Sequence, residues 1–176
     1  MTSRSRVALG VATVDLVWGS TYLAIRFAVE TLPPFLMAGT RFVVAGAILY
    51  GWRRAAGFPR PSAAQWRAAA VVGGLMLLVG NGGVTWAEQW VESGTAALMV
   101  ASVPLWMVLL DWARPGGRPP RRSVWAGILV GLLGVGLLFG GPELDPRYTL
   151  GWIALLVASI SWAAGSLYSR SAVLPA

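Results

Sequence analysis

The sequence has no cysteine and no histidine, and all fourteen of its basic residues are arginine. Without cysteine there can be no disulfide framework, iron–sulfur cluster or thiolate chemistry. Without histidine the usual proton shuttle and the commonest metal ligand are missing. Without lysine a Schiff-base or Ser–Lys mechanism has no residue to act through. We therefore expect no enzyme active site, no metal and no cofactor.

Charged side chains are also scarce. They make up 12% of the residues, about half the fraction typical of a soluble domain, whereas 56% of the residues are hydrophobic. The apolar residues form long uncharged blocks, which a water-soluble core does not need. The net charge of +7 lies on arginines in short loops, a pattern that indicates membrane orientation rather than nucleic-acid binding. We predict an all-α integral membrane protein that has the lipid bilayer as its solvent.

Six windows are long and apolar enough to cross a bilayer as transmembrane helices. They are residues 7–28, 33–52, 67–87, 93–112, 123–141 and 150–169. Prolines lie just outside these spans or in their first turns, where a missing N–H costs little. Pro104 is the exception and is expected to kink the fourth span. The first span is not expected to be a cleaved signal peptide, because Asp15 interrupts it and no small-x-small cleavage site follows.

The arginines and the acids separate between alternate loops. Eleven of the fourteen arginines lie on one side of the six spans, and five of the seven acids lie on the other. The basic side holds Arg4, Arg6, Arg53, Arg54, Arg60, Arg67, Arg114, Arg118, Arg121, Arg122 and Arg170, and the acidic side holds Glu30, Glu88, Glu92, Glu143 and Asp145. Because basic loops remain in the cytoplasm, the N-terminus is expected to be cytoplasmic.

A short pattern occurs twice along the chain. Trp18 and Arg26 in span one are followed by Leu-Pro, and so are Trp162 and Arg170 in span six. Five spans separate the two starts, so the second copy must be inverted, which is a common plan of secondary transporters. A chance recurrence of interfacial Trp and Arg is the alternative. On the repeat interpretation, residues 1–141 form a first five-helix repeat, 142–149 an extracytoplasmic loop, and 150–176 the first helix of a second, truncated repeat.

Several stretches are more specific than hydropathy. They are Trp18-Gly19-Ser20-Thr21-Tyr22 with Arg26, the segment from Pro34 to Phe42, Gly80-Asn81-Gly82-Gly83-Val84-Thr85 with Glu88, the segment from Ser93 to Pro104, and the segment from Ser159 to Tyr168. In these the chain resembles the EamA family of the drug/metabolite transporter superfamily, most closely its YedA-like subgroup. The family's Gly-Glu-Arg motif after span four is replaced here by Gly-Gly-Arg at 116–118.

The resemblance implies a ten-helix carrier of the inner membrane, built from two five-helix halves with both termini in the cytoplasm. It also implies export of small metabolites, amino acids or toxic compounds, driven by an ion gradient.

Polar side chains inside the spans are the candidates for a site, because Arg or Asp at a helix centre costs roughly 2.5–3.5 kcal/mol. Arg41 lies about 12 Å from the outer end of its helix, and Tyr22 and Asn81 lie roughly 9 Å deep. We expect them to share one cavity, in which Arg41 clamps an anionic group or gates access. The expected cavity residues are Trp18, Tyr22, Arg41, Asn81, Ser102 and Trp162. Such an aromatic cavity with one Arg suits amphipathic organic solutes.

Asp15, Arg26 and Glu88 form a second group of candidates. Asp15 and Glu88 are the two acids that could carry a coupling proton, and Arg26 is a candidate charge partner. Simpler alternatives stand beside these roles. Arg26 and Glu88 lie near span ends, where long side chains reach the interface, and Asp15 could pair with a structural partner.

The fifth span carries two GxxxG patterns, formed by Gly127, Gly131, Gly136 and Gly140. They indicate close helix packing, with a homodimer contact as the alternative.

The sequence as a whole favours a carrier for a small-molecule solute. A non-transporting membrane subunit is the alternative from a second class. An intramembrane enzyme is a remote third, because Asp15 and Asp111 belong to no protease motif.

Overall fold

The computed structural model describes residues 3–117, 119–138 and 146–175. Within these ranges every regular element is a helix and none is a strand, as predicted. The helices make six passes, and five are long and apolar enough to cross a membrane. These five are Ser5–Val29, Pro34–Ala55, Ala63–Ala87, Ser93–Ala113 and Tyr148–Ser169. The other pass contains the shorter apolar helix Arg122–Gly134. The chain is a multi-pass membrane protein.

The helices follow one another closely along the chain. Their bounds are α1 (Ser3–Val29), α2 (Pro34–Ala55), α3 (Ala63–Gly73), η1 (Gly74–Asn81), α4 (Gly82–Ala87), α5 (Ser93–Val100), α6 (Val103–Ala113), α7 (Arg122–Leu138) and α8 (Pro146–Ser169). The third pass is α3, η1 and α4 in succession, and the fourth is α5 and α6.

The first, third and sixth passes each begin four residues before their apolar windows, and local chemistry explains two of these starts. The third begins at Ala63 because Ser62 and Gln65 form a capping box, in which each side chain accepts a hydrogen bond from the other's backbone N–H. The sixth begins at Pro146, since proline fits the first turn of a helix, where its missing N–H is no loss. The length of an apolar window alone does not predict these two starts, because they depend on a capping box and on a proline.

The fourth pass is broken where a kink was predicted. Helix α5 ends at Val100 and α6 begins at Val103, with Pro104 in the first turn of α6. Proline lacks the N–H that would continue the α5 ladder and clashes with the preceding turn. The prediction for Pro104 is therefore confirmed.

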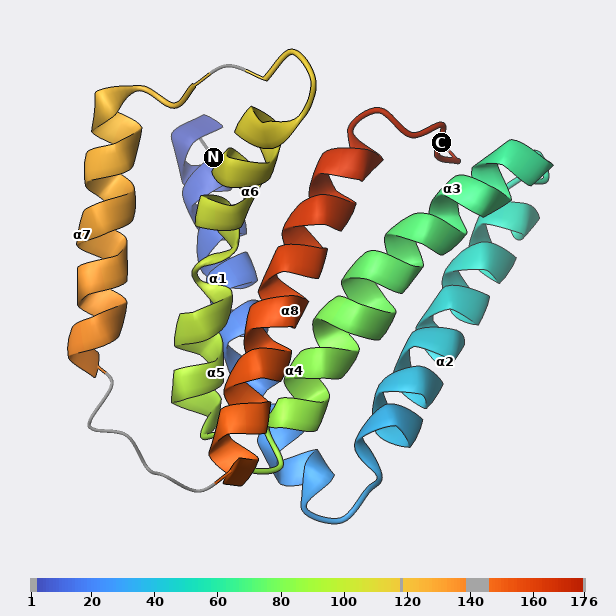
Figure 1. The fold of residues 1–176 in the computed structure, drawn as a ribbon. Helices are drawn as coiled ribbons and strands as arrows, with labels where there is room; N and C mark the ends of the chain where they lie inside the picture. Colours follow the sequence, from blue (N-terminus) through green and yellow to red (C-terminus); the bar gives the residue numbers. More distant parts are fainter. Residues whose placement is uncertain (1–2, 118, 139–145, 176) are drawn as a thin grey trace.

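Successive passes run in opposite directions, so α1 and α8 are antiparallel (Figure 1). Both chain ends, the α2–α3 connection and the α6–α7 connection lie at one end of the bundle. These are the connections in which the arginines concentrate. Of the loop positions used to predict sidedness, Arg118, Glu143 and Asp145 lie outside the described residues. The backbone thus collects the basic connections at one end, as the membrane topology requires.

Helix α8 lies at the centre of the packing, against η1, α4 and α6. Its contacts are close because small residues face it. A methyl group added at Gly83 would lie 3.1 Å from the Ala158 Cβ, and one at Gly165 would lie 2.6 Å from the Met76 Cγ. The buried cluster beside this interface comprises Val84, Ala87, Val91, Ala96, Leu155 and Ala158. Small residues at helix contacts are typical of membrane proteins, where close approach replaces the hydrophobic effect.

The close packing predicted for the glycines of the fifth span is not found within the described part of one chain. A methyl group added at Gly127 or Gly131 would meet no atom within 4 Å. Gly140 lies outside the described residues, and the side-chain environment of Gly136 is not described either. The interpretation as packing within the chain is therefore wrong for Gly127 and Gly131, because α7 turns this face away from its neighbours.

Large apolar side chains cover the outside of the bundle. Leu16 on α1 is 75% exposed and Val43 on α2 is 71% exposed. In water such a surface would aggregate, whereas lipid tails solvate it without penalty. The outer surface of the bundle therefore suits a bilayer, and several polar side chains gather at the site described next.

Candidate functional site

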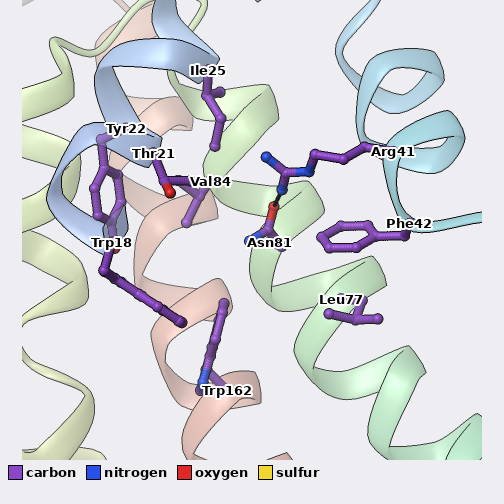
Figure 2. Close-up of a pocket in the computed structure, with 10 residues that line it drawn as sticks. All are labelled: Trp18, Thr21, Tyr22, Ile25, Arg41, Phe42, Leu77, Asn81, Val84 and Trp162. Carbon is purple, nitrogen blue, oxygen red and sulfur yellow. Dashed lines mark hydrogen bonds between the residues drawn. The ribbon is translucent and has the colours of Figure 1, made fainter. Parts of the chain in front are cut away.

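A pocket of about 330 Å³ lies between α1, α2, α8 and the third pass; we call it the central pocket (Figure 2). Its lining residues are Trp18, Thr21, Tyr22, Ile25, Arg41, Phe42, Leu77, Asn81, Val84 and Trp162. This volume is at the lower end of the range for small-molecule sites. It suits a solute of one or two rings.

Arg41 supplies the charge of the central pocket. It extends from α2 toward the third pass, where its Nη2 donates a hydrogen bond of 2.8 Å to the Asn81 Oδ1 (Figure 2). Its guanidinium carbon also lies 4.7 Å from the centre of the Phe42 ring, within the range of a cation–π contact. A guanidinium stays charged at any accessible pH and carries five N–H donors. Contact with one amide and one ring leaves it able to bind an anion.

Asn81 lies at the end of a segment in which the third pass changes its winding. Residues Gly74–Asn81 form the π-helix η1 in the middle of that pass. A π-helix is rare, and in proteins it is frequently found at functional sites. Its Leu75 carbonyl accepts a hydrogen bond of 2.8 Å from the Ser161 hydroxyl of α8. The π-helix is thus fastened to α8 and ends at the residue that faces Arg41.

Two tryptophans from the ends of the sequence meet at the pocket. The rings of Trp18 and Trp162 have centroids 5.5 Å apart and planes inclined at 71°, an edge-to-face contact. Behind Trp162 is Gly80, where an added methyl group would lie 3.0 Å from the indole. The glycine therefore makes room for the aromatic wall.

A second polar group lies one helical turn beyond the pocket. Val84 lines the pocket, and Glu88 follows it by four residues, just past the end of α4. The Arg26 guanidinium of α1 donates to the main-chain carbonyl of Glu88. Burial raises the pKa of the Glu88 carboxyl to about 8, although the charge of Arg26 acts to lower it. The candidate charge pair is therefore close together but does not form an ion pair.

The structure brings most of the expected cavity residues together. Trp18, Tyr22, Arg41, Asn81 and Trp162 all line the central pocket. Ser102 does not, because it lies at the break between α5 and α6, where its hydroxyl donates to the Met99 carbonyl and accepts from the Trp106 indole. Ser102 is therefore not a residue of the central pocket, contrary to expectation. Asp15 lies on the exposed part of α1 and is not a lining residue either.

Sequence reasoning missed several lining residues. Thr21 and Ile25 follow Trp18 by one and two turns, so helical periodicity alone could have found them. Phe42 is adjacent to Arg41, and an arginine often stacks on a neighbouring ring. Leu77 precedes Asn81 by four residues and Val84 follows Asn81 by three, so helical spacing could have found these two as well.

The residues of the central pocket suit recognition of a solute. Among the described residues no group of three His, Cys, Asp or Glu side chains could hold a metal ion. The pocket combines one permanent cation, one amide and several aromatic faces. Such a set can bind a planar solute that carries an acidic group.

Comparison with known proteins assigns the family. Residues 6–140 match the EamA-like transporter family. The chain belongs to this family. Membership agrees with the helical architecture and with the resemblance seen in the sequence, and it makes the protein a transporter-family membrane protein.

Relatives within the EamA-like family are similar over most of this chain. The uncharacterized inner membrane transporter YedA of Escherichia coli K12 is 44% identical over 91% of this chain and 52% of its own length. The aromatic amino acid exporter YddG of Ancylobacter novellus is 30% identical over 96% of this chain and 59% of its own length. The uncharacterized transporter YoaV of Bacillus subtilis is 25% identical over 94% of this chain and 57% of its own length. The chain thus spans somewhat more than half the length of these relatives, and no solved structure matches it.

Proposed function

We propose that this chain supplies the solute-binding part of an inner-membrane carrier that exports small amphipathic organic anions by alternating access. The basic end of the bundle, with the N-terminus, faces the cytoplasm in this proposal. Membership in a transporter family supports the general class. The proposed preference for amphipathic organic anions rests on the central pocket.

The observation that carries the proposal is the position of Arg41. It lies in the interior of a membrane-spanning helix, and its guanidinium contacts a neutral amide and a ring. A charge at such depth is costly and in membrane proteins is usually functional. An incoming carboxylate would offer the bidentate partner that a guanidinium prefers.

The aromatic residues favour a flat, apolar solute body. Trp18, Tyr22 and Trp162 face the same volume as Arg41. Indole and phenol rings bind planar groups by stacking and by edge contacts. The relative named as an aromatic amino acid exporter agrees with such a solute, although its name describes that protein alone.

Inversion of the α8 helix relative to α1 supports alternating access. In carriers built from inverted repeats, solute sites lie at the repeat interface near the bilayer midplane. Here the antiparallel helices α1 and α8 both supply a tryptophan to the pocket (Figure 1). We therefore interpret α8 as the start of the second repeat.

Binding and flux can be measured separately. The purified chain in detergent is titrated with indole-3-acetate and with the uncharged indole-3-acetamide, and release of each from preloaded vesicles is followed in parallel. We expect saturable binding that prefers the acid. Saturable release would establish carrier activity, binding without release would favour a non-transporting subunit, and lack of binding would contradict the proposed site.

A further inference from the structure

Glu88 is the largest fully buried polar side chain among the described residues, and its exposed fraction is 0%. It is the first residue past the end of α4 and therefore lies just beyond the span Ala63–Ala87. Both carboxyl oxygens are shielded from solvent, and neither has a hydrogen-bond partner within the described part of the chain. An ionised carboxylate without a partner in such a place is costly, and protonation removes most of that cost.

A positive charge lies nearby but contacts the wrong atom to neutralise the carboxylate. The Arg26 guanidinium donates to the main-chain carbonyl of Glu88. The same guanidinium could bind the carboxylate after a change of side-chain rotamer, because long arginine side chains have several rotamers at similar energy. Two arrangements of the carboxyl thus avoid an unpaired buried charge, one protonated and unpaired and the other ionised and paired with Arg26.

Among the side chains that the structure describes, the other charged and titratable groups around Glu88 do not provide a competing cation. Helix α1 contributes Tyr22 in addition to Arg26. Tyr148 of α8 packs against the apolar cluster that contains Ala87. The segment of α5, Ser93–Val100, contains no titratable side chain. Arg41 of α2 is hydrogen-bonded to Asn81. Glu92, on the connection between α4 and α5, is exposed.

We propose that Glu88 is a proton-binding site, protonated in the conformation described here and ionised when the Arg26 guanidinium turns from the main-chain carbonyl to the carboxylate. The ligand is a single proton. Apart from the turn of the Arg26 guanidinium, proton uptake and release change only the charge of this carboxyl.

The effect of burial on the carboxyl supports this site. Burial raises the pKa of Glu88 to about 8, and the nearby Arg26 charge partly opposes the rise. A carboxyl with this pKa exchanges its proton near neutral pH, where an ordinary glutamate would stay ionised.

The proton site is joined to the central pocket through two helices. Val84 lines the pocket one turn before Glu88, and Ile25 lines it immediately before Arg26. A movement of α1 against α4 that opens the pocket would therefore change the distance between Arg26 and the carboxylate. In the carrier this would couple proton binding to solute access, and that coupling rests on the proposed function, whereas the proton site itself does not.

The test is infrared spectroscopy of the purified chain in lipid vesicles, titrated between pH 5 and about 9, on either side of the carboxyl's expected titration. The stretching band of a protonated carboxyl should be present at neutral pH and disappear on titration near pH 8. In Glu88→Gln this band should be lost, whereas the exposed control Glu92→Gln should retain it. The infrared titration needs neither transport nor a solute. Its result can therefore be interpreted even if the carrier proposal fails.

A second variant leaves the glutamate in place. Arg26→Gln removes the nearby positive charge, so the band should persist to higher pH than in the unmodified chain. The proposal is overturned if no neutral-pH band depends on Glu88, or if the Glu88 band titrates at the pH of an ordinary carboxyl. It is also overturned if Arg26→Gln leaves the titration unchanged.

Discussion

The indole of Trp18 meets the indole of Trp162 edge to face, with ring centroids 5.5 Å apart. The two residues lie at corresponding positions of the short pattern that ends in Arg26 and Arg170. Equivalent residues of two inverted units come into contact when both lie near the axis that relates the units. The contact therefore agrees with the inverted-repeat interpretation, and on that interpretation the axis lies beside the central pocket.

The room for Trp162 depends on Gly80. In Gly80→Ala the added methyl group would lie 3.0 Å from the indole and 3.2 Å from the Leu75 carbonyl oxygen. We expect a net loss of about 1 kcal/mol of stability, because overpacking outweighs the helical preference for alanine. Thermal unfolding in detergent measures the loss. Gly73→Ala, which meets no atom within 4 Å, should be neutral or stabilising, and equal behaviour of the two variants would contradict the packing.

Sidedness can be tested with single cysteines, because the chain has none of its own. Thr31 and Ala56 are exposed and lie in connections at opposite ends of the bundle (Figure 1). An impermeant maleimide added outside intact cells should label Thr31→Cys and leave Ala56→Cys unlabelled. The reverse pattern would invert the orientation drawn from the arginines, and labelling of both would contradict the topology.

Much of the fold could be predicted because lipid imposes simple requirements. Six apolar windows gave six passes, and Pro104 marked the break between α5 and α6. The start of α3 could also have been predicted, since Ser62 and Gln65 have the spacing of a capping box. The π-helix could not, and its hydrogen bond with α8 joins Leu75 to Ser161, which is 86 residues away. Long-range contacts of this kind leave no local pattern.

The candidate site, like the fold, has features that the sequence could predict and contacts that it could not. Counting residues from the ends of α2 and the third pass placed Arg41 and Asn81 at similar depths in the membrane. The two side chains are hydrogen-bonded to each other. Ser102 was expected in the cavity, but it lies at the break between α5 and α6, where its hydroxyl bonds to Met99 and Trp106. The position of the Arg26 guanidinium on the main chain of Glu88 also depends on tertiary packing. Helical spacing could suggest the pair but not the atoms in contact.

Ser161 is expected to stabilise η1. Its hydroxyl donates to the Leu75 carbonyl inside the π-helix. Ser161→Ala should lower stability by about 0.5–1.5 kcal/mol, the usual range for one hydrogen bond. The same change should weaken solute binding, because η1 positions Asn81. Ser169→Ala is the matched control, since its hydroxyl bonds to Ser166 within its own helix, and equal effects on binding would refute the role of Ser161.

The stability of the protein should depend on pH through Glu88. Its pKa is about 8 in the folded chain and near 4.5 for an ordinary glutamate. The folded state therefore binds more protons between these values, so this group's stabilising contribution is complete below about 4.5 and decreases as the pH rises to 8. Thermal unfolding in detergent should show this decline. Glu88→Gln should remove it, whereas an unchanged profile in that variant would assign the pH dependence to other groups.

The central claim is that Arg41 binds the acidic group of a solute in the central pocket, and isothermal titration of Arg41→Gln tests it directly. Loss of a charged hydrogen-bonding partner should weaken indole-3-acetate binding about tenfold or more, which corresponds to roughly 1.4 kcal/mol. Binding of indole-3-acetamide should change little, since it carries no charge, and the exposed loop variant Arg60→Gln should bind both probes like the unmodified chain. Equal losses for the acid and the amide, or no loss for the acid, would contradict the claim.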